Sequence, residues 1–137
     1  MCWITFKEKY SKRKTAEKDI KVKKLLERDL HGNLSSPFFK FDWKIGKTHV
    51  SHIDKPRIHP LTMQGWHINT GLHSSKHIIM TKHWAYCYST WWFIPVNVKV
   101  LTVRKHNFEI HKAIIPKGSQ YYVNESGEYV SDKLIIL

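Results

Sequence analysis

The sequence predicts an α+β domain, mainly an antiparallel sheet of six to eight short strands with one central helix. Two observations lead to this fold class. Short runs in which apolar and polar residues alternate are separated by turn signals, and one segment near the middle combines a serine cap with a helix-like stretch. The length of 137 residues fits one domain. We divide the chain into a basic N-terminal arm at residues 1–18 and a single α+β domain at residues 19–137.

Four segments in the first half are expected to be extended. Residues 19–27 (DIKVKKLLE) begin with apolar residues alternating with lysines, which predicts the first strand. Residues 39–45 alternate large apolar side chains with charged ones, which predicts a second strand with a buried aromatic face. A short strand is expected around residues 49–53. Residues 66–75 form a strand or bend closed by Gly71.

The second half is expected to hold the helix and the remaining strands. Ser74 and Ser75 are N-cap candidates, so residues 76–85 (KHIIMTKHWA) are the predicted helix. Alternating valines predict a strand toward residue 103. Residues 108–137 contain three apolar runs separated by two turn signals, which predicts a three-stranded meander. Its last strand should be buried, because a loose end reading KLIIL would favour aggregation.

The charge balance is the strongest indication of function. The chain has 23 Lys and Arg against 11 acids, a net charge of +12, and a pI near 9.8. Half of that net charge lies in residues 1–28. Such a field favours a polyanionic partner, and nucleic acid is the commonest one. The expected contacts are Lys12, Arg13, Lys14, Lys21, Lys23, Lys24, Arg104 and Lys105, with Trp66 or Trp91 stacking on a base.

Signatures of other classes were not found in the sequence. The ten histidines and two cysteines show no compact metal-binding spacing, so we expect no metal and no cofactor. Cys2 could act as an N-terminal nucleophile only with a glycine-rich oxyanion loop, which we do not see, and we assign no catalytic residue. The N-terminus does not read as a signal peptide, and no apolar run has the length of a membrane span. We therefore expect an intracellular protein of the bacterial cytoplasm, or a virion-associated one, without a membrane partner.

Three short motifs carry a resemblance to a known family. Residues 114–119 (IIPKGS) and 127–135 (GEYVSDKLI) resemble the third conserved region of the mono-ADP-ribosyltransferase fold. Residues 72–75 (LHSS) resemble its second region, and Lys23 or Lys24 would stand where the family has an arginine. The resemblance implies NAD binding, with Asp132 in place of the catalytic glutamate. The implied protein is an ADP-ribosyltransferase-like enzyme or a degenerate relative of one.

A second resemblance concerns the whole chain. Its MCW start, GLHS segment and YVSDK ending resemble short uncharacterised proteins of gut bacteria and their phages. We therefore favour a non-catalytic basic protein that binds nucleic acid, as a phage accessory or virion-associated protein. The transferase-like enzyme is one alternative. The other is a structural protein–protein interaction module, which could also associate with itself and in which the charge serves only solubility.

Overall fold

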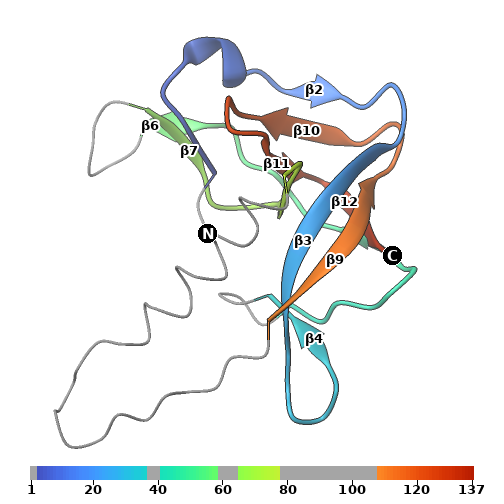
Figure 1. Cartoon of the computed structure of the whole chain (residues 1–137). Coiled ribbons are helices and arrows are strands. Elements are labelled where there is room, and N and C mark those ends of the chain that lie inside the picture. Colours follow the sequence, from blue (N-terminus) through green and yellow to red (C-terminus); the bar gives the residue numbers. More distant parts are fainter. Residues whose placement is uncertain (1–2, 37–40, 59–64, 78–107) are drawn as a thin grey trace, which may run out of the picture.

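The computed structural model of the chain describes residues 3–36, 41–58, 65–77 and 108–137, and over these residues it is nearly all β-sheet (Figure 1). Strands account for 53% and helix for 3%. The helical part of the described residues is a single 3-10 turn, η1 (Glu8–Tyr10). The predicted α+β class with a central helix is therefore wrong, and the described chain forms twelve strands in two antiparallel sheets.

The helix prediction is wrong for a physical reason that lies at residues 74 and 75. Ser74 and Ser75 are the last two residues of a strand, β8 (Leu72–Ser75). Their backbones pair with a neighbouring strand, opposite Tyr129 and Glu128. Cross-strand pairing thus overrides a capping signal that is local and weak. Residues 78–85 of the predicted helix and the predicted strand near residues 96–103 lie outside the described residues.

The larger sheet contains nine strands and supplies most of the core. Its strands are β2 (Lys14–Thr15), β3 (Ile20–Arg28), β4 (Leu34–Ser35), β5 (Thr48–Val50), β8, β9 (Phe108–Ile115), β10 (Gln120–Val123), β11 (Glu128–Ser131) and β12 (Lys133–Ile136). Their order is β2-β10-β11-β8-β3-β9-β12-β5, with β4 paired to β3. The predicted first strand at residues 19–27 is confirmed as β3, and β5 lies where a short strand was expected.

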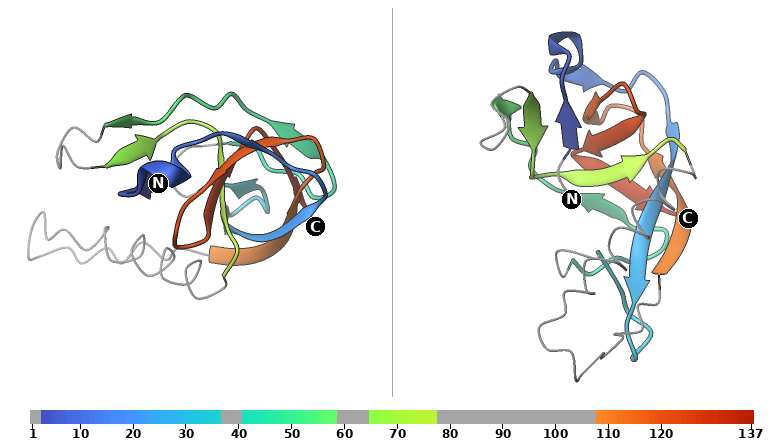
Figure 2. Two further views of the ribbon diagram at one scale, coloured as in Figure 1. Left: turned by 90° about the horizontal axis from the view of Figure 1, so that it is seen from above. Right: turned by 60° about the vertical axis from the view of Figure 1, so that its left-hand side comes forward.

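The larger sheet curls round on itself. Strands β11 and β12 are joined by Asp132 alone, yet they stand at opposite ends of the path β11-β8-β3-β9-β12. The left view of Figure 2 looks along this ring. Asp132 fixes the bend, because its N–H donates to the Gln120 carbonyl at 3.0 Å and its carboxylate accepts the Gln120 N–H at 2.9 Å. The carbonyl of Asp132 accepts the Ser51 N–H.

The longest pairing in the ring joins β3 to β9. It runs in register from Ile20 opposite Ile115 to Glu27 opposite Phe108. Side chains alternate between the two faces of each strand, so one set fills the ring. The other set lies on the outer face of the ring, where Lys21 is exposed, Lys23 is half-buried and Leu25 is buried. The inward set and its neighbours form the main core, which comprises Val22, Leu26, Leu34, Trp43, Leu72, Ala113, Ile115, Leu134 and Ile136.

The predicted second strand at residues 39–45 is not a regular strand over residues 41–45. Trp43 bridges Leu34 of β4, whereas Ile45 bridges Ile136 of β12. The segment therefore crosses between two strands and cannot follow either of them. Trp43 is buried with 3% exposure, but Ile45 is 59% exposed, so the expected apolar face is only partly buried.

The C-terminal residues form four strands and not a three-stranded meander. Strands β10 and β11 form a hairpin, as the turn signal at residues 124–127 indicates. Strand β9 pairs with β3 and β12, and not with β10. The predicted burial of the last strand is confirmed, because β12 lies between β9 and β5 and both Leu134 and Ile136 have no exposed surface.

The smaller sheet has the order β1-β7-β6, with β1 (Trp3–Thr5), β6 (Arg57–Ile58) and β7 (Trp66–Ile68). Side chains tie it to the larger sheet. The Trp3 indole N–H donates to the Glu128 carbonyl at 2.9 Å, and the Asn124 amide donates to the Ile4 carbonyl at 2.9 Å. A second core of Trp3, Ile53, Ile68, Tyr122 and Val130 fills the space between the sheets.

The N-terminal segment belongs to both sheets from residue 3 onward. It supplies β1 to the smaller sheet and β2 to the edge of the larger one, and Ala16 is buried beside it. Over the described residues, no helix is long and apolar enough to cross a membrane. The same residues contain no group of three His, Cys, Asp or Glu side chains placed to hold a metal ion.

Candidate nucleic-acid interface

Three lysines gather on the outward face of the β3–β9 pair. Lys21 and Lys23 alternate with the inward residues of β3, and Lys112 lies directly opposite Lys23 on β9. Lys21 and Lys112 are exposed and Lys23 is half-buried. None of the three forms an ion pair with a residue that the structure describes. Two like charges opposite each other on a sheet are unfavourable, by roughly 0.2 to 1 kcal/mol.

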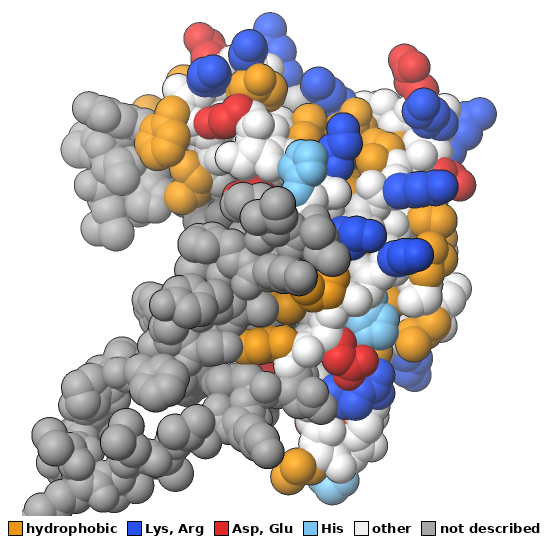
Figure 3. Space-filling view, in the orientation of Figure 1, with side chains coloured by type: hydrophobic (Ala, Val, Ile, Leu, Met, Phe, Trp, Pro, Cys, Tyr) orange, Lys and Arg blue, Asp and Glu red, His pale blue; other side chains and the backbone are white. Residues whose placement is uncertain are grey.

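The positive charge continues beyond these strands. Lys14 on β2 and Lys18 in the β2–β3 connection are exposed and lie next to the start of β3. In Figure 3 the Lys and Arg side chains gather at the top and along the right-hand side, over β2, β3 and β9. We call the set of Lys14, Lys18, Lys21, Lys23 and Lys112 the lysine stripe. An arrangement of this kind can hold several anionic groups in a row.

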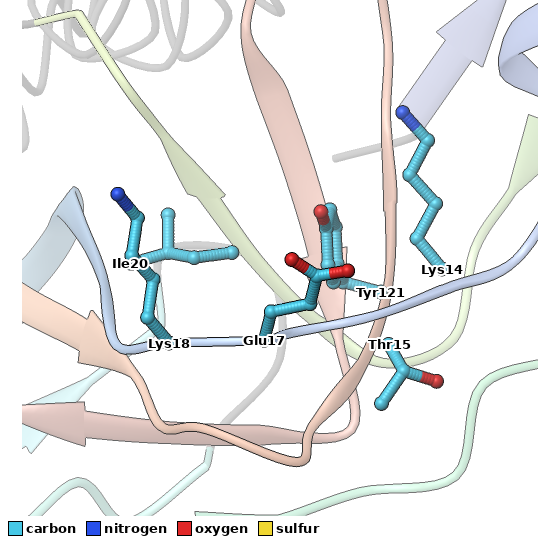
Figure 4. A pocket seen from close by; sticks show the side chains of 6 residues that line it. All are labelled: Lys14, Thr15, Glu17, Lys18, Ile20 and Tyr121. Atoms are coloured by element: carbon cyan, nitrogen blue, oxygen red, sulfur yellow. The ribbon is translucent and has the colours of Figure 1, made fainter.

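An open pocket of about 790 Å³ lies at the β2 end of the stripe. Its lining combines charged, polar and apolar side chains, namely Lys14, Thr15, Glu17, Lys18, Ile20 and Tyr121. Figure 4 shows the two lysine ammonium groups on either side of Tyr121 and Glu17. Tyr121 lies opposite Lys14 in the β10–β2 pairing, which fixes the aromatic ring beside a cation.

The aromatic ring in this pocket is that of Tyr121, and a second tyrosine supports it. The ring of Tyr121 lies 5.7 Å from the ring of Tyr129, measured between centroids, with the planes tilted by 38°. Tyr129 packs against the main core, and this burial raises the pKa of its phenol. Because Tyr129 is fixed by the core and its ring contacts the ring of Tyr121, the Tyr121 ring has little freedom to move at the surface.

Three of the predicted contacts, Lys14, Lys21 and Lys23, lie in the stripe. Lys12 is exposed between η1 and β2 and does not line the pocket. Arg13 joins the β5–β6 connection to β10, because its guanidinium donates to the Ile53 carbonyl at 2.8 Å and to the Tyr122 hydroxyl at 3.2 Å. Trp66 is half-buried in β7 of the smaller sheet. Trp91, Arg104 and Lys105 lie outside the described residues.

Lys24 points into the ring and not toward solvent. It is 7% exposed, its ammonium donates to the His73 carbonyl at 2.7 Å, and it lies 5.1 Å from the centroid of the Trp43 ring. Desolvation lowers the pKa of this lysine to about 8. The alternation of β3 already indicates this position, because Lys24 shares its face with Val22 and Leu26. A buried lysine cannot reach a polyanion.

Sequence reasoning missed Glu17, Lys18, Lys112 and Tyr121. Lys18 and Glu17 lie at the end of the basic arm and carry no pattern that separates them from their neighbours. Lys112 joins the stripe only through the β3–β9 register, and Tyr121 joins the pocket only through the β10–β2 register. A single sequence contains no signal for either pairing.

The residues matched to the transferase motifs are mostly inaccessible. Ser74 and Ser75 have no exposed surface, and Lys24 is buried beside them. Asp132 uses its carboxylate to hold the β11–β12 bend. The transferase interpretation stays a prediction, and NAD binding by the full chain would support it.

Comparison with known proteins adds no assignment. No protein-family model matches the sequence, and no curated protein or solved structure matches it either. The support for this candidate interface therefore comes from the residues of this chain alone.

Proposed function

We propose that this protein binds nucleic acid without catalysis, through phosphate contacts made by the lysine stripe. The observation that carries the proposal is the cross-strand pair of Lys23 and Lys112, which no described acid neutralises. The chain tolerates the repulsion between these ammonium groups on its longest strand pair. A bound phosphate would relieve that repulsion, since it supplies the missing negative charge.

The geometry supports a strand of phosphates better than a single anion. Lys21 and Lys23 are two residues apart on one strand, so their Cα atoms are about 6.6 Å apart, comparable to the step between neighbouring phosphates. Lys18 and Lys14 extend the row toward β2, and Lys112 lies beside Lys23 on β9. Contacts of this type give affinity without sequence specificity, with dissociation constants of roughly 10⁻⁴ to 10⁻⁶ M at physiological salt. A protein of this kind would act where nucleic acid is handled or packed, in a bacterial cytoplasm or in a virion.

Fluorescence anisotropy tests the proposal directly. The full chain, cleared of carried-over nucleic acid, is titrated into labelled single- and double-stranded DNA and RNA at several salt concentrations. The logarithm of the affinity should fall linearly with the logarithm of the salt concentration, with a slope of several units. Absence of binding at low salt, or binding that is insensitive to salt, would refute it.

Charge variants locate the contact. Replacing Lys23 and Lys112 with glutamine removes two phosphate contacts, so the slope should become shallower by about 1.4 to 1.8. The matched control replaces Lys47 and Lys55, which are exposed outside the stripe, and should leave the slope near that of the wild type. An interaction module that uses a protein partner predicts instead that neither double variant changes binding to that partner.

A further inference from the structure

We propose that the pocket between Lys14 and Lys18 holds one unpaired nucleobase, with guanine preferred, so that the nucleic acid on the stripe is single-stranded. This inference rests on the proposed function, because the stripe supplies the phosphate contacts on which the base contact builds. Figure 4 shows the elements that carry it, which are two cations, an aromatic ring and a carboxylate around one open space.

The aromatic ring in the pocket fits the face of a base. Tyr121 is half-buried and its ring is supported by Tyr129, so little conformational freedom is lost when a flat ligand stacks on it. Ile20 adds an apolar wall to the same pocket. Stacking of a base on an aromatic side chain contributes about 1 to 3 kcal/mol in single-strand binding proteins. Bases inside a duplex are covered by their neighbours and cannot make this contact.

The two flanking lysines fit the backbone on either side of that base. The Lys14 and Lys18 ammonium groups lie on opposite sides of the tyrosine, where the phosphates that precede and follow a splayed-out nucleotide would lie. Ile20 lines the pocket and packs against the main core, so the next residue, Lys21, faces the opposite side of β3. A strand bound at the pocket would reach Lys21 and the rest of the stripe by passing round the start of β3.

The carboxylate of Glu17 indicates which base edge is read. It is exposed, lines the pocket and accepts no hydrogen bond from a described residue. An acid in a polyanion site weakens binding unless it accepts hydrogen bonds from the ligand. Guanine offers two adjacent donors, N1–H and the N2 amino group, which match the two oxygens of a carboxylate. Thymine and uracil offer one donor between two carbonyl oxygens, which repel it. These edges are free only in an unpaired strand.

The test compares labelled thymidine 11-mers that differ only at the central position, which is a guanine, a thymine or an abasic site. The wild-type protein should bind the guanine strand about five- to tenfold more tightly than the thymine strand. The abasic strand should bind about as tightly as the thymine strand, because one of its other thymines can enter the pocket by a shift of register. Annealing the guanine strand to its complement should remove the advantage.

Substitutions of Tyr121 and Glu17 test the role of each residue in the pocket. Tyr121→Leu should remove the difference between the guanine and abasic strands, whereas Tyr121→Phe should retain it. Glu17→Gln should abolish the preference for guanine over thymine without affecting the fold, because the side chain is exposed. Glu8→Gln, which alters an exposed acid in η1, is the matched control.

The outcomes separate the two proposals. If no 11-mer binds at low salt, the nucleic-acid function fails and this inference fails with it. If all 11-mers bind with a steep salt dependence but neither the central base nor the Glu17 and Tyr121 variants matter, the function stands and the base pocket is refuted.

Discussion

The buried Lys24 predicts an unusual dependence of stability on pH. Its ammonium group has no acidic partner among the described residues, donates to the His73 carbonyl and lies over the Trp43 ring. The informative change is Lys24→Met, which keeps an apolar stem of similar length and removes the charged nitrogen. The matched control is Lys21→Met on the same strand, where the lysine is exposed.

The magnitude follows from the pKa of Lys24. Desolvation lowers this pKa from 10.5 to about 8, and each pKa unit corresponds to about 1.4 kcal/mol, so the buried charge costs about 3 kcal/mol at pH 7. Between pH 8 and pH 10.5 the unfolded chain holds a proton that the folded chain has released. Stability therefore rises with pH across this window, because the cost disappears as Lys24 becomes neutral.

The variant should lack this rise. At pH 7, Lys24→Met removes the cost of about 3 kcal/mol but leaves the His73 carbonyl without its donor, which costs about 1 to 3 kcal/mol. The variant should then equal the wild type or exceed it by up to about 2 kcal/mol. Between pH 7 and pH 10 the free energy of unfolding of the wild type should rise by about 2 to 3 kcal/mol relative to that of the variant. The His73 ring is neutral throughout, since burial and the nearby Lys24 lower its pKa to about 3.

Urea unfolding followed by tryptophan fluorescence at pH 7, 8, 9 and 10 measures this difference. Subtracting the variant from the wild type cancels the titration of exposed lysines and tyrosines. Parallel pH profiles for the wild type and Lys24→Met would refute the reasoning, because they would mean that the ammonium is hydrated in the folded protein. Lys21→Met should follow the wild type at every pH.

Three further predictions concern the turns and the stripe. Gly71→Ala should lower the free energy of unfolding by about 2 to 4 kcal/mol, because φ is +86° and the new Cβ would lie 2.6 Å from a valine methyl of β11. The control is Gly32→Ala, where φ is +81° but the space is open, and it should cost only about 1 kcal/mol. Equal losses in thermal melts would contradict the role of crowding. Asn124→Ala should lower the free energy of unfolding in urea by about 2 to 4 kcal/mol, because three hydrogen bonds are lost. The side-chain nitrogen donates to the Ile4 carbonyl of the smaller sheet, and the side-chain oxygen accepts two N–H groups at the β10–β11 turn. Asn124→Asp keeps the acceptor and should lose less. Lys112→Glu should stabilise the fold by about 0.5 kcal/mol through attraction to Lys23 while weakening nucleic-acid binding, and stronger binding by this variant would reject the stripe.

The strands with a clear alternation could be predicted from the sequence, but their partners could not. Residues 19–27 alternate strictly at their start, and β3 lies there. Ser74 and Ser75 carry a local capping signal, and pairing with β11 outweighs it. The pairing of β3 with β9 depends on contacts between distant parts of the chain, which no local pattern encodes.

The same limit applies to the candidate site, in which local sequence indicates some residues and strand pairing alone reveals the others. Lys14, Lys21 and Lys23 were found because they are basic and close together in sequence. Lys24 was misplaced because charge was counted without regard to which side of the strand it faces. Lys112 could be found only from the register of a distant strand.

The β3–β9 pairing also sets the order in which the molecule can fold. One end of the pairing is held by the ion pair of Arg28 and Glu109, which are 81 residues apart in sequence. Closing a loop of that length costs about 4 kcal/mol of chain entropy before any contact forms, whereas the β10–β11 hairpin closes within microseconds. The hairpin should therefore form early and the ring late, on the millisecond-to-second scale of non-local sheets. In that interval β3 is an unpaired strand, and its run of lysines keeps it from joining a strand of another chain.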